Sequence, residues 1–263
     1  MNGVAYFRER LHADELKNSL TCQLKTHNMN FYKGEIFAID KPYGMTSFGA
    51  LAHVRYVISR KLGIKRIKIG HAGTLDPLAT GVLVLCTGKA TKQIEQLQAH
   101  TKEYVCTIQL GATTASYDCE HPVNATYPTE HITLERIEQV LKLFVGEIQQ
   151  TPPTYSACKV AGERAYNLRR AGEEVALQAK TVRIDEIELI HFDSNTMQLQ
   201  LRIVCGKGTY IRALARDLGR TLDSGAYLTQ LRRTRVGALT IENSINFDHF
   251  KEWLNEQEID EGH

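Results

Sequence analysis

The sequence lacks several features that would place it in a specialised class of proteins. No apolar run approaches the roughly 20 residues that a helix needs to cross a bilayer, and the first ten residues contain no apolar signal segment. The six cysteines form no Cys-x-x-Cys pair and show no cysteine–histidine spacing typical of zinc. We therefore expect a cytoplasmic protein with reduced thiols, no metal site and no membrane partner.

Acidic residues are missing from one long stretch of the chain. Between Asp40 and Asp76 there are seven lysines and arginines and no acid. Residues 1–241 contain 31 basic and 23 acidic residues, whereas residues 242–263 contain seven acids and one base. A basic body is typical of proteins that bind nucleic acids, although the solvated surface of an ordinary protein shows the same balance.

Asp76 ends that stretch within the segment GHAGTLDPLATG at residues 70–81. Two β-prone runs, at 66–69 and 82–86, flank the segment, which predicts a shaped loop between two strands. Three glycines and a proline favour a loop with a defined backbone. A lone carboxylate on such a loop, amid cations, is where a polyanion can be held beside a reactive group, but Asp-Pro is also an ordinary turn.

Hydrophobic periodicity predicts a mixed α+β domain. Strands are expected at residues 36–39, 103–110, 182–184, 187–189 and 197–205. Amphipathic helices are expected at residues 48–62, at 134–144 and from 211 onward, the first with Thr46 or Ser47 as its N-cap. Residues 113–128 are polar and turn-rich. Strand groups with interspersed helices and no regular βαβ period are typical of the α+β class.

The chain is expected to divide into three parts. Residues 1–33 form a polar N-terminal extension, residues 34–241 the main domain, and residues 242–263 a short acidic tail with one helix. The tail residues expected to pack back on the domain are Phe247, Phe250 and Leu254. Within the domain, residues 154–180 mix bases with tyrosines, a pattern that can grip RNA but that a solvated helical hairpin shares.

Three motifs together resemble one known family. They are Asp40-Lys41-Pro42-x-Gly44-x-Thr46-Ser47, Gly70-His71-x-Gly73-Thr74-Leu75-Asp76-Pro77-Leu78-Ala79-Thr80-Gly81 and Lys207-Gly208-Thr209-Tyr210-Ile211-Arg212. From about residue 34 to about residue 238 the chain resembles the bacterial tRNA pseudouridine synthase B family, the TruB-type tRNA pseudouridine-55 synthases. The resemblance implies a mixed, largely antiparallel central sheet flanked by helices, with residues 154–180 as an insertion that clasps RNA.

The resemblance also implies an activity. This is the isomerisation, without a cofactor, of the T-loop uridine at position 55 of tRNA: the base is flipped out, detached from the ribose at N1 and rejoined through C5. The partner implied is the T-stem-loop of tRNA, bound by a monomer. The family often carries a small RNA-binding domain after the catalytic one, and the residues beyond Ala238 are too few to form it.

Eight residues fall on functional positions of the family. The resemblance makes Asp76 the catalytic aspartate, Arg212 the arginine that pairs with it and Tyr104 the candidate for taking the C5 proton. The residues expected to bind the substrate are His71, Tyr210, Leu231, Lys41 and Lys207. His71 would fill the space left by the flipped base, Tyr210 would contact the target base and Leu231 would line the uridine pocket.

Two other functions stay open at this point. A non-catalytic module that binds or folds tRNA on the same scaffold would not require the set of Asp76, Tyr104 and Arg212. A carboxylate-dependent nucleoside or glycoside hydrolase would need a second carboxylate, and none lies near Asp76 in the sequence. Whether Asp76 attacks C6 of the ring or C1′ of the ribose does not follow from the sequence.

Overall fold

The structure is a computed structural model that describes residues 28–155, 159–160, 163–164 and 177–260. The strands are β1 (Ile36–Lys41), β2 (Ile69–His71), β3 (Thr80–Thr87), β4 (Lys102–Leu110), β5 (Ala112–Thr114), β6 (Val123–Thr126), β7 (Gly146–Gln150), β8 (Lys159–Val160), β9 (Glu163–Arg164), β10 (Lys180–Asp193), β11 (Gln198–Cys205), β12 (Ala226–Val236), β13 (Leu239–Thr240) and β14 (Ile245–Asn246). The helices are α2 (Ser47–Lys61), the 3-10 helix η1 (Gly88–Gln93), α3 (Ile94–Ala99), α4 (Leu134–Lys142), α6 (Ile211–Thr221) and α7 (Phe250–Asn255).

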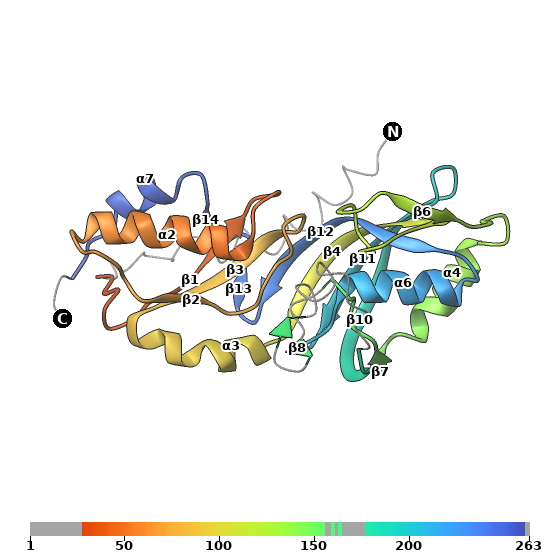
Figure 1. The fold of residues 1–263 in the computed structure, drawn as a ribbon, viewed down its shortest axis with the longest axis horizontal. Helices are drawn as coiled ribbons and strands as arrows, with labels where there is room; N and C mark the ends of the chain where they lie inside the picture. Colours follow the sequence, from red (N-terminus) through yellow and green to blue (C-terminus); the bar gives the residue numbers. More distant parts are fainter. Residues whose placement is uncertain (1–27, 156–158, 161–162, 165–176, 261–263) are drawn as a thin grey trace, which may run out of the picture.

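One mixed sheet runs along the elongated molecule, with α2, α3 and α7 in one half and α4 and α6 in the other (Figure 1). Its strand order is β14-β1-β3-β12-β4-β11-β10-β7, with β13 on β12 and β2 on β3. The pairs β1–β14 and β3–β12 are parallel and the other pairs of this sheet are antiparallel. The predicted α+β class with a mixed, largely antiparallel sheet is confirmed.

The two halves of the sheet meet at β12. On one side β12 pairs with β4 over most of its length, and on the other it pairs with β3 only at Arg232 and Arg233. Arg232 lies opposite Thr80, the first residue of β3. The loop that connects β2 to β3 therefore ends at this junction, and it is the loop that carries Asp76.

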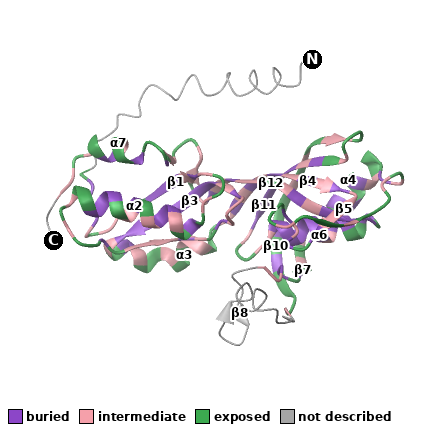
Figure 2. Ribbon diagram, turned by 45° about the horizontal axis from the view of Figure 1, so that its top comes forward, coloured by how far each residue is buried: buried purple, intermediate pink, exposed green. Residues whose placement is uncertain are grey.

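A separate apolar core supports each half. In the first, residues from β1, β3, α2 and α7 pack together, among them Ile39, Val54, Leu83 and Phe250. In the second half, the core is formed by residues from β4, β11, α4, α6 and β12. Figure 2 shows the buried residues in both halves of the sheet and in the helix faces that cover it. The junction therefore lies between two halves that each have their own apolar core.

The structure confirms much of the predicted periodicity. Every second residue of β4 is buried, from Lys102 to Leu110. The Thr46 hydroxyl caps α2 by accepting a hydrogen bond from the Gly49 amide at 2.9 Å, and Gly63 follows this helix with a φ of 65°. The short helix of the acidic tail is also present as α7, packed back through Phe250 and Leu254.

Three predicted segments differ from the structure. The strand expected at 66–69 begins only at Ile69, and the polar segment 113–128 contains the two-stranded ribbon of β5 and β6. The two strands expected at 182–184 and 187–189 are one strand, β10. Its register against β11 shifts between Ile184 and Glu186, so a bulge interrupts the alternation of buried residues and mimics a chain break.

The N-terminal boundary also differs from the expected division of the chain. Met29 and Phe31 are buried in the first core. The Met29 amide donates to the Glu258 carbonyl, and the Met29 carbonyl accepts from the Asp260 amide, both at 2.9 Å. Residues 29–33 are therefore packed against the tail, and the boundary placed after residue 33 falls inside the packed domain.

Part of the expected insertion lies outside the described residues, namely 156–158, 161–162 and 165–176. The short strands β8 and β9 pair with each other within it.

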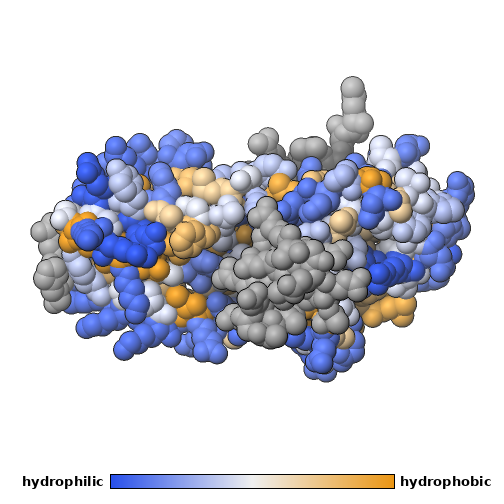
Figure 3. Space-filling model, in the orientation of Figure 1, coloured by the Kyte–Doolittle hydropathy of each residue, from blue (hydrophilic) through white to orange (hydrophobic). Residues whose placement is uncertain are grey.

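On the face drawn in Figure 3, hydrophilic residues predominate and the hydrophobic areas are small and separate. No helix in the described part of the chain has the length and apolar character needed to cross a membrane.

Candidate active site

The loop between β2 and β3 is held by hydrogen bonds from three directions. The Ser47 side chain, at the start of α2, accepts from the Leu75 amide at 2.8 Å and donates to the Leu75 carbonyl at 2.9 Å. The Gly44 amide donates to the Pro77 carbonyl at 2.9 Å, and the Arg233 guanidinium donates to the Gly73 carbonyl at 3.0 Å. The Asp76 side chain projects from this fixed backbone and is 38% exposed.

Gly81 allows the loop to join the sheet at β12. It has a φ of 105°, and a Cβ there would lie 2.1 Å from the Arg233 carbonyl oxygen. Only glycine combines this backbone conformation with so close an approach. Gly81, which ends the second motif, thus allows β3 and β12 to approach closely where the two halves of the sheet meet.

Arg212 joins the loop to the second half of the molecule. It is the second residue of α6 and only 4% exposed, and its Nε lies 2.8 Å from Oδ2 of Asp76. The rest of its guanidinium donates to the carbonyls of Ser116 and Tyr155, at 3.1 and 2.8 Å. Since these bonds fix the guanidinium, Arg212 can hold the Asp76 carboxylate in one orientation.

A second carboxylate, that of Asp118, lies near the same nitrogen of Arg212. Oδ2 of Asp118 is 3.5 Å from the Arg212 Nε, and the Asp118 side chain is 9% exposed. Its Oδ1 accepts hydrogen bonds from the Ser116 hydroxyl and from the Glu120 amide. Asp118 is therefore occupied as an acceptor, and it shares the charge of one arginine with Asp76.

Tyr104 faces the site from β4, directly opposite Arg233 on β12. The buried Arg233 guanidinium lies close enough to the Tyr104 phenol to influence its pKa, and it donates to the Val82 carbonyl at 2.7 Å. Burial raises the pKa of the Tyr104 phenol, and the nearby Arg233 charge opposes this rise only in part. The phenol is therefore neutral in the free protein at pH 7, and it can act as a base only after it has lost its own proton.

A cavity of about 740 Å³ opens between the loop and α6. Six of the eight predicted site residues line it: Asp76, Tyr104, Lys207, Tyr210, Arg212 and Leu231. Its size is that of pockets that enclose small organic groups. The structure thus brings together residues from β4, β12, α6 and two loops, as the resemblance implies.

The other two predicted residues lie elsewhere. His71 is half-buried at the end of β2 and is outside the lining of this cavity. Lys41 is fully buried, and its Nζ donates to the carbonyls of Pro42, Met45 and Pro77, at 2.8, 2.6 and 3.3 Å. Lys41 thus ties the first motif to the Asp76 loop, and its ammonium is directed at the protein backbone.

Burial lowers the pKa of Lys41 to about 8; the Asp76 charge opposes this shift and the Arg233 charge adds to it. An unfolded lysine keeps its proton up to about pH 10.4, so the unfolded chain binds more protons between these values, and stability rises with pH across this window. We expect Lys41 to raise the free energy of unfolding by at most about 3 kcal/mol across this window. Urea unfolding of the wild-type protein and of Lys41→Met, from pH 7.5 to 10.5, measures this rise.

The Lys41→Met variant should show a smaller rise in the free energy of unfolding than the wild type. Burial also lowers the pKa of Lys102 to about 8, so part of the rise is expected to persist in the variant. Lys61→Met provides the control, because Lys61 is exposed. If Lys41→Met and Lys61→Met follow the same pH dependence, the charge of Lys41 is not destabilised by its burial.

Two residues of the site escaped the sequence analysis. Asp118 lies in the polar segment 113–128, where one acid among turn residues carries no periodic signal. Arg233 is one of three arginines in the run Leu231-Arg232-Arg233-Thr234-Arg235, which resembles a solvated basic stretch. Arg233 differs from its neighbours in being fully buried, and burial depends on strand register.

In the described part of the chain, no group of three or more metal-ligating side chains is found.

Comparison with solved structures gives the class of fold. The chain is 29% identical to a chain in a crystal structure of a Cbf5–Nop10–Gar1 complex, with a TM-score of 0.62 over 86% of this chain. It is 27% identical, with a TM-score of 0.57, to a chain in the structure of an H/ACA RNP bound to a substrate RNA containing 2′-deoxyuridine. It spans only 57% and 55% of those two chains. The fold is that of the pseudouridine synthases.

Sequence comparisons then give the family. The chain is 59% identical to tRNA pseudouridine synthase B of Bacteroides thetaiotaomicron, over 88% of this chain and 98% of that protein. It is 46% identical to tRNA pseudouridine synthase B of Flavobacterium johnsoniae, over 85% of this chain and 97% of that protein. The family model for the N-terminal domain of the TruB family pseudouridylate synthases matches residues 59–211. The chain belongs to the TruB family of pseudouridylate synthases.

A second family model matches the end of the chain. The model for the C-terminal domain of tRNA pseudouridylate synthase B covers residues 212–262. This match begins at Arg212 and includes nearly all of α6 and the whole of β12. The strand β12 is part of the main sheet, and both elements contribute to the second core. The boundary expected before residue 242 does not coincide with the start of this match at residue 212.

Proposed function

We propose that the protein is an isomerase that converts a uridine of tRNA to pseudouridine. One observation carries the proposal: Asp76, on a loop fixed from three sides, is paired with the buried Arg212 at the wall of a cavity that Tyr104, Tyr210 and Leu231 also line. The tRNA pseudouridine synthases B that match nearly the full chain support the same activity. No finding favours a non-catalytic module.

The target is the T-loop uridine at position 55. A base inside folded RNA is out of reach of side chains, so it is flipped into the cavity at a cost of a few kcal/mol of unstacking. His71, five residues before Asp76, would occupy the place that the base leaves. Leu231 and Tyr210 would then hold the uracil ring against Asp76.

The reaction balances without a co-reactant. The bond between N1 and C1′ breaks, a bond between C5 and C1′ forms, and the proton lost from C5 is replaced by one taken up at N1. Asp76, oriented by its ion pair with Arg212, would supply a nucleophile or a counter-charge for the developing cation, at C6 or at C1′. Tyr104 would take the C5 proton after its phenol has given up its own proton, which can become the proton taken up at N1.

Lys41 and Lys207 have different roles in this proposal. The three carbonyls around the Lys41 ammonium make it a residue that positions the Asp76 loop. Lys207 is exposed at the mouth of the cavity and can reach a phosphate of the RNA. We place the protein in the cytoplasm, as a monomer.

A hydrolase is the alternative that the structure makes concrete, because Asp118 supplies the second carboxylate that the sequence lacks near Asp76. The deciding experiment incubates the protein with an unmodified tRNA transcript, maps pseudouridine and assays free uracil. We expect pseudouridine at position 55 and no uracil. Release of uracil would indicate the hydrolase, and absence of both products at saturating protein would contradict the proposed isomerase.

Recognition should be confined to the T-arm of the tRNA. Proteins of this kind read the shape of a loop and its splayed bases, and the site lies in a single cavity at the sheet junction. We therefore expect an isolated T-stem-loop to be modified with nearly the same kcat/KM as whole tRNA, measured under identical salt conditions. A strong preference for whole tRNA would show that contacts outside the T-arm contribute.

A further inference from the structure

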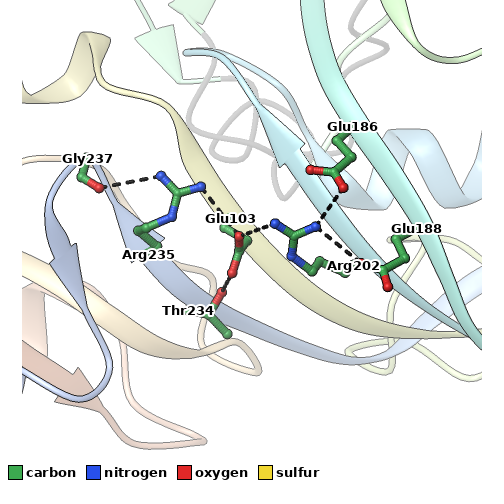
Figure 4. Close-up of polar contacts among 7 residues, drawn as sticks. All are labelled: Glu103, Glu186, Glu188, Arg202, Thr234, Arg235 and Gly237. Atoms are coloured by element: carbon green, nitrogen blue, oxygen red, sulfur yellow. Dashed lines mark hydrogen bonds and ion pairs between the residues drawn. The ribbon is translucent and has the colours of Figure 1, made fainter. Parts of the chain in front are cut away.

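A cluster of charged side chains lies on the sheet at the end of β12 that carries Arg233. The Glu103 carboxylate accepts hydrogen bonds from the Thr234 hydroxyl at 2.8 Å, from Arg202 at 2.8 Å and from Arg235 at 3.4 Å. Arg202 is also held by Glu186 and Glu188 of β10, at 2.9 and 3.2 Å (Figure 4). We refer to Glu103, Thr234 and Arg235 as the Glu103 clamp.

The Glu103 clamp coincides with an irregularity in strand pairing. Along β12, Arg233 lies opposite Tyr104 and Arg235 lies opposite Glu103, so Thr234 is an extra residue between two consecutive positions of β4. Such a bulge changes the direction in which the following side chains point, and bulges are frequent next to active sites. Here both Thr234 and Arg235, the residues after Arg233, direct polar groups to the same carboxylate.

The other side of the bulge is the site. Arg233 is buried and contacts Tyr104, the Val82 carbonyl and the Gly73 carbonyl of the Asp76 loop. Glu103 and Tyr104 are consecutive residues of β4, so their side chains leave opposite faces of the sheet. The Glu103 side chain therefore makes no direct contact with the cavity, and it can influence Tyr104 through the backbone of β4 or through that of β12. Only the route through β12 involves Thr234 and Arg235.

We propose that Glu103 is a positioning residue: by holding Thr234 and Arg235 it fixes the β12 bulge, and the bulge fixes Arg233 against Tyr104 and the Asp76 loop. A carboxylate suits this task because it accepts from several donors at once, and the local surroundings keep it charged. Hydrogen bonds from Thr234 and Arg202 lower the pKa of Glu103 and outweigh its burial. The inference rests on the proposed isomerase activity.

The test uses Thr234→Val, which removes the hydroxyl and keeps the shape of the side chain, and Glu103→Gln, which keeps the size of the side chain and removes its charge. The matched control is Glu188→Gln, which removes one ligand of Arg202 on β10 and leaves the clamp intact. We expect single-turnover rates at saturating tRNA to fall about tenfold in the two clamp variants and to stay at the wild-type value in the control. The affinity for tRNA should be unchanged in all three.

A double-mutant cycle separates positioning from general stability. In an Arg233→Lys background the Glu103→Gln change should have almost no further effect on the rate, because the group that it positions is already altered. Additive losses, or equal losses in Glu188→Gln, would overturn the inference and leave the cluster as a support of the sheet.

A readout that needs no activity keeps the two proposals distinguishable. The Nε–H of Arg233 is buried in a hydrogen bond to Val82, so its exchange with solvent, followed by NMR, should be slow in the wild type and faster in Thr234→Val. Unchanged exchange in Thr234→Val would overturn the inference even if the enzyme is active. If the wild-type protein makes no pseudouridine but exchange is faster in Thr234→Val, the proposed function is refuted. The structural link between Thr234 and Arg233 is then retained.

Discussion

Asp76→Asn is expected to abolish pseudouridine formation while largely preserving the affinity for tRNA. Asparagine keeps the shape of the side chain but loses the charge that Arg212 stabilises and the electron pair that would attack the substrate. Removal of one carboxylate from a catalytic group lowers kcat by roughly 10⁴-fold in a well-studied protease. Affinity should persist because most of the binding free energy to nucleic acid comes from phosphate contacts made elsewhere.

The measurement is a single-turnover rate on a tRNA transcript together with an equilibrium binding assay at fixed salt. Asp223→Asn is the matched control, since Asp223 is an exposed aspartate after α6 whose partner is Arg136 on α4. The control should behave as the wild type in both assays. Substantial turnover by Asp76→Asn would disprove the catalytic assignment, and a parallel loss of binding would instead indicate that the loop has a structural role.

Arg212→Met should have the second large effect, on activity and on stability together. The substitution leaves Asp118, which is 9% exposed, without its cation and removes the donors to the carbonyls of Ser116 and Tyr155. Loss of one partner from a buried ion pair typically costs about 3–5 kcal/mol of unfolding free energy. Turnover should fall to the level of Asp76→Asn, because Asp76 is no longer oriented.

A double variant separates these two effects. Adding Asp118→Asn to Arg212→Met removes the uncompensated buried charge, so part of the lost stability should return in urea unfolding. Activity should not return, because Asp76 still lacks its partner. If activity recovers together with stability, Arg212 serves only to maintain the fold; if Arg212→Met is as stable as the wild type, the Asp118 carboxylate is not held by this charge.

Local features of the fold could be predicted because they depend on neighbouring residues. The alternation of apolar residues in β4 and the helical spacing after Thr46 follow from the periods of strand and helix, which any buried face imposes. The strand β10 was divided in two because a bulge shifts its alternation, and the periodic pattern cannot distinguish a bulge from a break. Burial of Met29 and Phe31 was missed because it requires the tail as a partner.

The sequence by itself determined the family, through the long motif around Asp76 and the motif that ends at Arg212. Through the family it also indicated the residues proposed to carry the chemistry. Only the tertiary structure decided how they are held. Arg212 reaches Ser116 and Tyr155 across 96 and 57 residues of chain, and Arg233 reaches Gly73 across 160. Such contacts depend on strand order and strand register, which bring distant segments together. The free energy that selects them comes from burying two apolar cores at once, and no short stretch of sequence carries that information.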